Sequence, residues 1–179
     1  TTVIALRLML LTFVRTVELR KAEWSEFDLD RAEWRIPAER MKMREPHIVP
    51  LSRQAVELLR ELHTHTGGRG LLFPNYRNPK ECMTATTLNR ALERMGFNGK
   101  DSIGFSAHGF RATASTILNE MGYRPDVIER QLAHAERNKV RASYNQAEYM
   151  EDRRTMMQEW ADMVENIKKP KEGAEQCQD

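Results

Sequence analysis

Residues 107–122 read AHGFRATASTILNEMG, and this stretch decides the fold of the C-terminal half of the chain. Its apolar residues recur at helical spacing, which predicts a helix from His108 to Met121 that ends at Gly122. The residues predicted to form its apolar face are Phe110, Ala114, Ile117, Leu118 and Met121. We expect His108 and Arg111 on the opposite side, one turn apart, where the helix dipole favours an anion. A His-x-x-Arg pair alone usually lies on a solvated surface, so further motifs are needed before a function can be inferred.

Helical spacing recurs through most of the remaining chain. The other predicted helices cover residues 3–14, a short turn at Glu18 and Leu19, a segment from the N-cap Ser52 to Gly67, a segment from Thr84 to Met95, and a segment that starts at Pro125. After Tyr144, residues 150–167 predict one more amphipathic helix. Its stripe of Met157, Trp160 and Val164 is expected to pack on protein, either the chain's own body or a neighbour.

The period of the apolar residues changes to two between residues 24 and 49. The predicted strands cover residues 24–29, 34–36 and 47–49, with a turn at residues 30–31. This pattern indicates a small three-stranded antiparallel sheet. The predicted fold class is therefore α+β, mainly α-helical.

Composition predicts one domain in a reducing compartment. The chain has 179 residues, of which 40% are hydrophobic, and a net charge of +2, which is too small to argue for DNA binding. The two cysteines, Cys82 and Cys177, support neither a disulfide framework nor a zinc cluster. His63 and His65 are better explained as exposed residues at a helix end than as metal ligands. We expect the domain to span residues 1–169 and residues 170–179 to form a disordered polar tail.

Two segments in the N-terminal half resemble motifs of the tyrosine recombinases, the phage-integrase type of enzyme. Residues 12–24, with Arg15-Thr-Val-Glu18-Leu19 leading into a strand, resemble the first arginine box of that family. Residues 41–52, with Lys42 near the start, resemble the hairpin that carries the family's catalytic lysine. Each segment alone would be weak evidence for a resemblance to that family.

Three further segments follow in the family's order. Residues 107–113 match its His-x-x-Arg box, Leu132-Ala-His134 resembles the later box that holds a His or Trp, and Arg141-Ala-Ser-Tyr144 follows at the distance expected for the nucleophile. Residues 128–138 and 152–157 resemble integrases of prophages, satellite phages and genomic islands. Five boxes in order make the resemblance specific to the catalytic domain of these enzymes.

The resemblance implies a cationic clamp for the scissile phosphate. Arg15 and Arg111 would hold the non-bridging oxygens, because a guanidinium is permanently charged and binds phosphate through two parallel hydrogen bonds. His134 would be an added donor, and Glu18 would orient Arg15. Without the resemblance, Arg15 would be explained as a cation at a helix end.

The remaining roles concern proton transfer and attack. Tyr144 would attack the phosphorus and His108 would take its proton. Lys42 would protonate the departing 5′ oxygen. The other tyrosines, Tyr76, Tyr123 and Tyr149, compete with Tyr144 for the nucleophile's role, but Tyr149 lies too far past His134 for the family spacing.

Lys42 is the assignment that depends most on the resemblance. Its neighbours Arg40, Arg44 and Glu45 would ordinarily indicate a solvated hairpin. His47, which starts the next strand, fits either a strand-end residue or a contact with the DNA backbone, and the sequence leaves both open.

The implied function is site-specific DNA recombination through a 3′-phosphotyrosine intermediate, with no metal and no nucleotide cofactor. The expected partners are duplex DNA at attachment sites, further copies of the chain in a tetramer, and accessory DNA-bending or excisionase proteins. We expect a bacterial cytoplasmic, nucleoid-associated enzyme whose N-terminal DNA-binding domains are absent from this chain. The alternatives are a type IB topoisomerase, which shares the chemistry and works as a monomer, and a helical DNA-binding module without catalysis.

Overall fold

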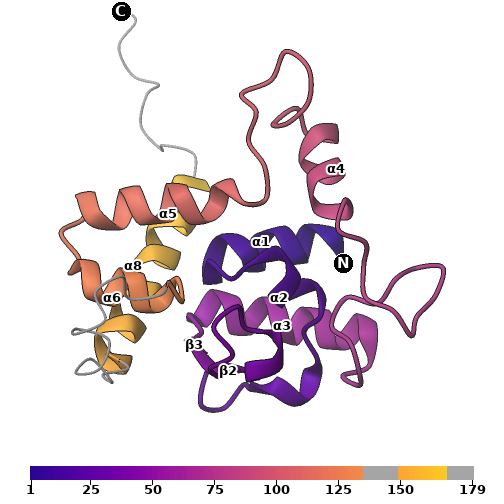
Figure 1. Ribbon diagram of the computed structural model, residues 1–179, viewed down its shortest axis with the longest axis horizontal. Helices are drawn as coiled ribbons and strands as arrows, with labels where there is room; N and C mark the ends of the chain where they lie inside the picture. The colour runs from indigo at the N-terminus through magenta and orange to yellow at the C-terminus, as the bar shows by residue number, and fades with distance from the viewer. Residues whose placement is uncertain (135–148, 169–179) are drawn as a thin grey trace, which may run out of the picture.

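A computed structural model describes residues 1–134 and 149–168 of the chain. Helices dominate it, and one three-stranded sheet packs among them, as the sequence predicts (Figure 1). The elements are α1 (Thr2–Thr12), α2 (Thr16–Arg20), β1 (Phe27–Asp28), β2 (Glu33–Ile36), β3 (His47–Pro50), α3 (Arg53–Thr66), α4 (Thr87–Arg94), α5 (Gly109–Glu120), α6 (Pro125–Gln131) and α8 (Met150–Lys168), with 3-10 turns η1 (Trp24–Glu26) and η2 (Ala38–Arg40).

Helix α1 forms the centre of the core. It is apolar on nearly all sides and contacts α2, α3, α4, α5 and α8, which explains why its sequence shows so little polar face. The helix ends at Phe13, whose φ of 58° lies in the left-handed region and whose N–H donates to the Met9 carbonyl. This reversal turns the chain so that Arg15 becomes the N-cap of α2.

The sheet has the order β1-β2-β3 and is antiparallel throughout, with Trp34 opposite Val49 in the central pair. The predicted first strand, residues 24–29, is wrong at its start. Trp24 donates its N–H to the Gly70 carbonyl, and Glu26 donates back to Glu23, so η1 replaces the first half of that strand. Only two residues remain to pair with β2.

The predicted ends of the middle helices are largely confirmed. Ser52 caps α3 by accepting a hydrogen bond from Ala55 N at 3.3 Å, and Gly67 ends the helix with a φ of 75°. Pro125 occupies the first turn of α6 as predicted. Helix α4 begins three residues later than Thr84, because Thr84 forms a turn that precedes the helix.

Helix α5 has the predicted position, but its faces differ from the prediction. The buried residues are Arg111, Ala114 and Leu118, so Arg111 belongs to the inward row instead of the outward one. Met121, expected on the apolar face, is 40% exposed. The prediction failed because a charged residue was assumed to face solvent, whereas Arg111 finds backbone acceptors inside the protein.

Helix α8 packs on the chain's own body, which confirms that its apolar stripe contacts protein. Met157 and Trp160 are fully buried, and the Trp160 indole donates to the Leu10 carbonyl of α1 at 2.9 Å. The Trp160 ring also meets Phe13 edge to face at 5.0 Å between centroids. Ile167, near the end of the stripe, is 76% exposed, so the buried contact stops before the helix does.

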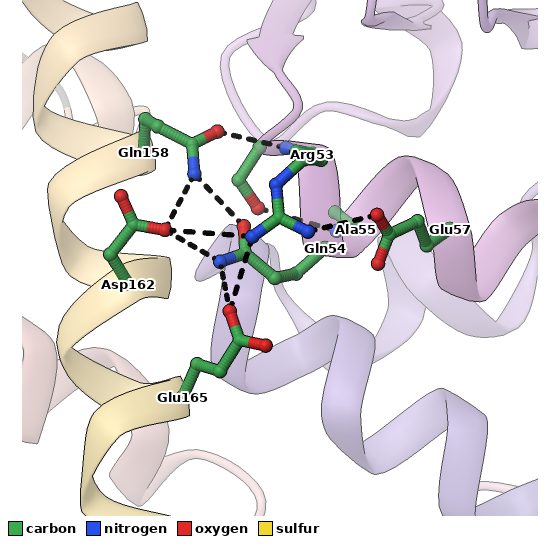
Figure 2. Close-up of polar contacts among 8 residues, drawn as sticks. Arg53, Gln54, Ala55, Glu57, Gln158, Asp162 and Glu165 are labelled. Carbon is green, nitrogen blue, oxygen red and sulfur yellow. Dashed lines mark hydrogen bonds and ion pairs between the residues drawn. The ribbon is translucent and has the colours of Figure 1, made fainter.

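A polar seam joins the outer side of α8 to the N-terminal end of α3. Figure 2 shows three side chains of α8 that point toward Arg53 and Gln54. The Gln54 amide donates to Asp162 at 2.7 Å and to Glu165 at 2.9 Å, and Gln158 accepts from the Arg53 backbone N–H at 2.9 Å. This seam fixes the rotation of α8 about its axis through directional hydrogen bonds.

Candidate active site

Arg15 is held by Glu18 in the first turn of α2. The Arg15 backbone N–H donates to Glu18 Oε2 and the Arg15 Nη1 donates to Glu18 Oε1, each at 2.7 Å. The Glu18 side chain is 2% exposed and the Arg15 side chain 23%, so a buried carboxylate orients a partly exposed guanidinium. This geometry is what the sequence predicts for Glu18.

Arg111 lies deeper than Arg15. Its Nη1 donates to the Phe13 carbonyl and its Nη2 to the Leu132 carbonyl at 2.5 Å. The residue is 5% exposed, and burial, followed by the charge of Arg15, lowers the Arg111 pKa to about 10. A guanidinium with that pKa still carries its charge at neutral pH.

The C-terminal end of α6 brings the two arginines together. Leu132 accepts from Arg111, and the next carbonyl, that of Ala133, accepts from Arg15 Nη2 at 3.0 Å. Carbonyls at a helix end carry partial negative charge, which offsets part of the repulsion between the two guanidinium groups. Arg15 and Arg111 lie 96 positions apart in the sequence, yet they share the consecutive carbonyls of Leu132 and Ala133. We call this pair of carbonyls the platform.

His134 follows this platform directly. Its Nδ1 lies 2.7 Å from Glu129 Oε2, and its backbone N–H donates to the Glu129 carbonyl. The imidazole is 44% exposed, so it stands at the surface beside the Ala133 carbonyl that Arg15 uses. The structure thus gathers Arg15, Arg111 and His134, three of the predicted site residues, around one turn of chain.

The other predicted site residues lie at the edges of this arrangement or outside it. His108 is the exposed N-cap of α5, one turn before Arg111. Lys42 is exposed on the connection between η2 and β3, so it lies on the predicted hairpin. Within residues 1–134 and 149–168, no hydrogen bond or ion pair joins Lys42 or His108 to the two arginines. Tyr144 lies outside the described residues.

The three competing tyrosines differ in their surroundings. The Tyr123 hydroxyl donates to Glu159, and burial together with that carboxylate raises the Tyr123 pKa, which makes its phenolate harder to form. The Tyr149 ring lies 5.2 Å from the Arg124 guanidinium carbon. Tyr76 is 100% exposed. Tyr123 is therefore a poor candidate for a nucleophile.

A buried polar network that the sequence did not reveal lies under the platform. Gln131 donates to the Thr12 carbonyl at 3.0 Å and accepts from Arg153 Nε at 3.0 Å, and Arg153 also donates to the Ile48 carbonyl at 2.5 Å. The Arg153 side chain is fully buried. The network joins α1, α6, α8 and β3, and it thereby fixes the end of α6, which the platform follows.

His47 belongs to the same network. It is 4% exposed, and its Nε2 lies 3.3 Å from the Gln131 carbonyl, which can only accept, so Nε2 carries the proton. Burial, then the nearby Arg153 charge, lowers the His47 pKa from 6.5 to about 3. Of the two interpretations left open by the sequence, the buried strand-start residue fits, and a contact with the DNA backbone does not.

Arg40 also differs from its expected surroundings. Its side chain is only 14% exposed, and it forms an ion pair with Glu26, whose side chain is 11% exposed. The Arg40 Nη1 donates to the Glu18 carbonyl at 3.2 Å. The start of the Lys42 hairpin is therefore anchored in protein, and no signal in the local sequence distinguishes Arg40 from the solvated Arg44.

No helix in the described ranges is long and apolar enough to cross a membrane.

Comparison with solved structures identifies the fold. The integrase from mycobacterium phage Brujita superposes with a TM-score of 0.65 at 19% identity, over 87% of this chain and 50% of that one. The XerA recombinase gives a TM-score of 0.60 at 17% identity, over 94% of this chain and 58% of that one. At these identities the likeness shows a shared fold.

Sequence comparison is more specific. The integrase of Enterobacteria phage P4 is 48% identical over 90% of this chain, and prophage integrase IntA of Escherichia coli K12 is 47% identical over 87% of it. The chain spans 40% and 37% of those two proteins. The sequence model of the Phage integrase family matches residues 1–151. The chain therefore belongs to the phage integrase family.

Proposed function

We propose that this chain is the catalytic part of a site-specific DNA recombinase that cuts and rejoins DNA through a 3′-phosphotyrosine link, and so integrates or excises a mobile element. The observation that carries the proposal is the pairing of Arg15 and Arg111 on two consecutive carbonyls, those of Leu132 and Ala133, directly after α6. Glu18 and the two carbonyls already offset part of the repulsion between these cations, and a phosphodiester, the anion that the family resemblance supplies, would bring further negative charge to both.

The different exposure of the two arginines supports a different role for each of them. Arg15 uses Nη1 and Nη2 for protein contacts and is partly exposed, so its remaining N–H groups can reach a phosphate oxygen. Arg111 lies beneath it and adds positive charge at short range in a site of low dielectric constant. Glu18 keeps Arg15 in one rotamer, so little reorganisation is needed when negative charge develops at the phosphorus.

The other residues complete the reaction. Tyr144 attacks the phosphorus and its phenol proton passes to His108, which lies one turn from Arg111 at the exposed start of α5. The bond between phosphorus and the deoxyribose 5′ oxygen breaks, and Lys42 protonates that oxygen. His134, held by Glu129, donates to a non-bridging oxygen. Rejoining reverses these steps, and the bond energy kept in the phosphotyrosine replaces an external energy source.

The substrate in this proposal is duplex DNA at two attachment sites. A solved relative by fold, the Tn1549 transposon integrase, was determined in complex with circular intermediate DNA, with a TM-score of 0.57 to this chain. We also propose that strand exchange requires four copies of the chain and uses accessory DNA-bending or excisionase proteins. A type IB topoisomerase would share the cleavage step but would not exchange strands.

A covalent trap tests the proposal directly. The full chain is mixed with nicked DNA that contains an attachment site, and a denaturing gel separates free protein from protein linked to DNA. We expect an adduct with the wild-type chain and with Tyr76→Phe, a change at a fully exposed tyrosine, and none with Tyr144→Phe. An adduct in Tyr144→Phe would move the nucleophile elsewhere, and DNA binding without any adduct in the wild-type chain would favour a non-catalytic DNA-binding module.

A further inference from the structure

We infer that Arg40 is a positioning residue that fixes the Lys42 hairpin against α2. It thereby sets the position of Lys42, the general acid of the proposed reaction, relative to Arg15. The inference rests on the proposed function of Lys42. It starts from the observation that Arg40 lies two residues before Lys42 and yet its side chain is only 14% exposed, whereas Lys42 and Arg44 are exposed.

The contacts of Arg40 join two separate elements. Its Nη1 donates to the Glu18 carbonyl in α2 at 3.2 Å, and its Nη2 forms an ion pair with Glu26 in η1. Glu26 Oε2 also accepts from the Trp34 indole of β2 at 2.9 Å. The Nη2 atom is buried and, among the described residues, has no hydrogen bond of regular geometry, so the Glu26 charge is its compensation.

Glu18 connects this anchor to the clamp. Its carbonyl accepts from Arg40 and its carboxylate holds Arg15, so one residue contacts both the Lys42 hairpin and the arginine that would bind the phosphate. A displacement of α2 relative to the hairpin would therefore break a contact on one side of Glu18. This arrangement relates the position of Lys42 to that of Arg15 through described contacts alone.

The chain on both sides of Lys42 is also held. Met41 is 6% exposed in the core, its N–H donates to the Ala38 carbonyl at 3.1 Å, and its carbonyl accepts from Arg44 N–H at 3.0 Å. The Lys42 backbone thus lies within a turn whose first residues are anchored by Arg40 and Met41. The Lys42 side chain is exposed on this anchored turn, which suits a group that must reach a leaving oxygen.

The test separates Arg40 from a merely structural residue by changing the leaving group. Sulfur in place of the bridging 5′ oxygen leaves as a thiolate without a proton, because a thiol has a pKa near 8.5. A misplaced general acid costs about 10²-fold in rate. We expect Arg40→Met to slow adduct formation by about that factor on the oxygen substrate and to recover on the sulfur substrate, as Lys42→Ala should. The double variant should be no slower than Lys42→Ala.

Controls distinguish the possible failures. Arg44→Met removes the same charge from the same hairpin and should leave the rate within about twofold, since exposed charges contribute little. Glu26→Gln removes the charge partner of Arg40 and tests the anchor if Arg40→Met does not fold. An Arg40→Met defect that persists with sulfur, or that multiplies with Lys42→Ala, overturns the inference while leaving the proposed function intact. Lys42→Ala without sulfur rescue overturns both the Lys42 role and the inference.

Discussion

The buried His47 predicts a specific loss of stability in mild acid. In the folded chain its pKa is lowered to about 3 by burial and by Arg153, whereas the unfolded chain has the ordinary value of 6.5. Below pH 6.5 the unfolded state therefore binds a proton at His47, whereas the folded state does not bind it until about pH 3. The contribution of neutral His47 to the free energy of unfolding is therefore complete above pH 6.5 and is lost as the pH falls through this window.

The magnitude follows from the two pKa values. Each pH unit within the window costs about 1.4 kcal/mol for one proton, so lowering the pH from 7 to 5 should remove about 2 kcal/mol from the free energy of unfolding. Urea unfolding of the wild-type chain at several pH values measures the total change, which includes other titrating groups. The His47 contribution is the difference between the wild-type curve and that of His47→Gln.

The substitution His47→Gln keeps a side-chain N–H that can donate to the Gln131 carbonyl but removes the titration. We expect its stability to be less dependent on pH between 7 and 5, while His65→Gln, at an exposed position of α3, keeps the wild-type dependence. Parallel curves for the wild-type chain and His47→Gln would refute a buried, neutral His47. The result would then mean that the histidine is protonated in the folded chain.

Three further substitutions test the platform and the docking of α8. Arg111→Lys should lower the free energy of unfolding by about 1–3 kcal/mol in urea titrations, because one ammonium cannot serve both the Phe13 and Leu132 carbonyls; unchanged stability would contradict the buried contacts. Trp160→Ala should cost about 3–5 kcal/mol and expose α8 to hydrogen exchange, since the indole is 1% exposed. Arg53→Met should leave the free energy of unfolding nearly unchanged, because its ion pairs are half exposed, and a clear loss would show that the seam matters more than its exposure indicates.

The sequence predicted the elements whose determinants are local. The Ser52 cap, Pro125 at the start of α6 and the alternating pattern of β2 and β3 act within a few residues, so they are visible without a structure. The first strand was overextended because the partner of the Trp24 N–H, the Gly70 carbonyl, lies far along the chain. Local pattern carries no information about such a pairing.

The same distinction between local and distant determinants applies to the candidate site. The family boxes brought Arg15, Glu18, Arg111 and His134 to attention, and the contact between Arg15 and Glu18 could be anticipated because those two residues are one helical turn apart. The inward direction of Arg111 was missed, as its acceptors come from distant segments. Arg40 was missed for the same reason, and the assigned catalytic roles stay predictions.

The platform at the end of α6 has a consequence for which sequence changes this protein can accept. Both arginines are held there by main-chain oxygens, which every amino acid supplies, so the acceptors themselves do not depend on side-chain identity, although Leu132 is buried and must stay apolar. Ala133 has a φ of 49°, so glycine would fit its backbone at least as well. Inserting or deleting a single residue there would instead shift both acceptors at once. The length of the segment should therefore be held nearly constant, which makes it a poor place for engineered insertions.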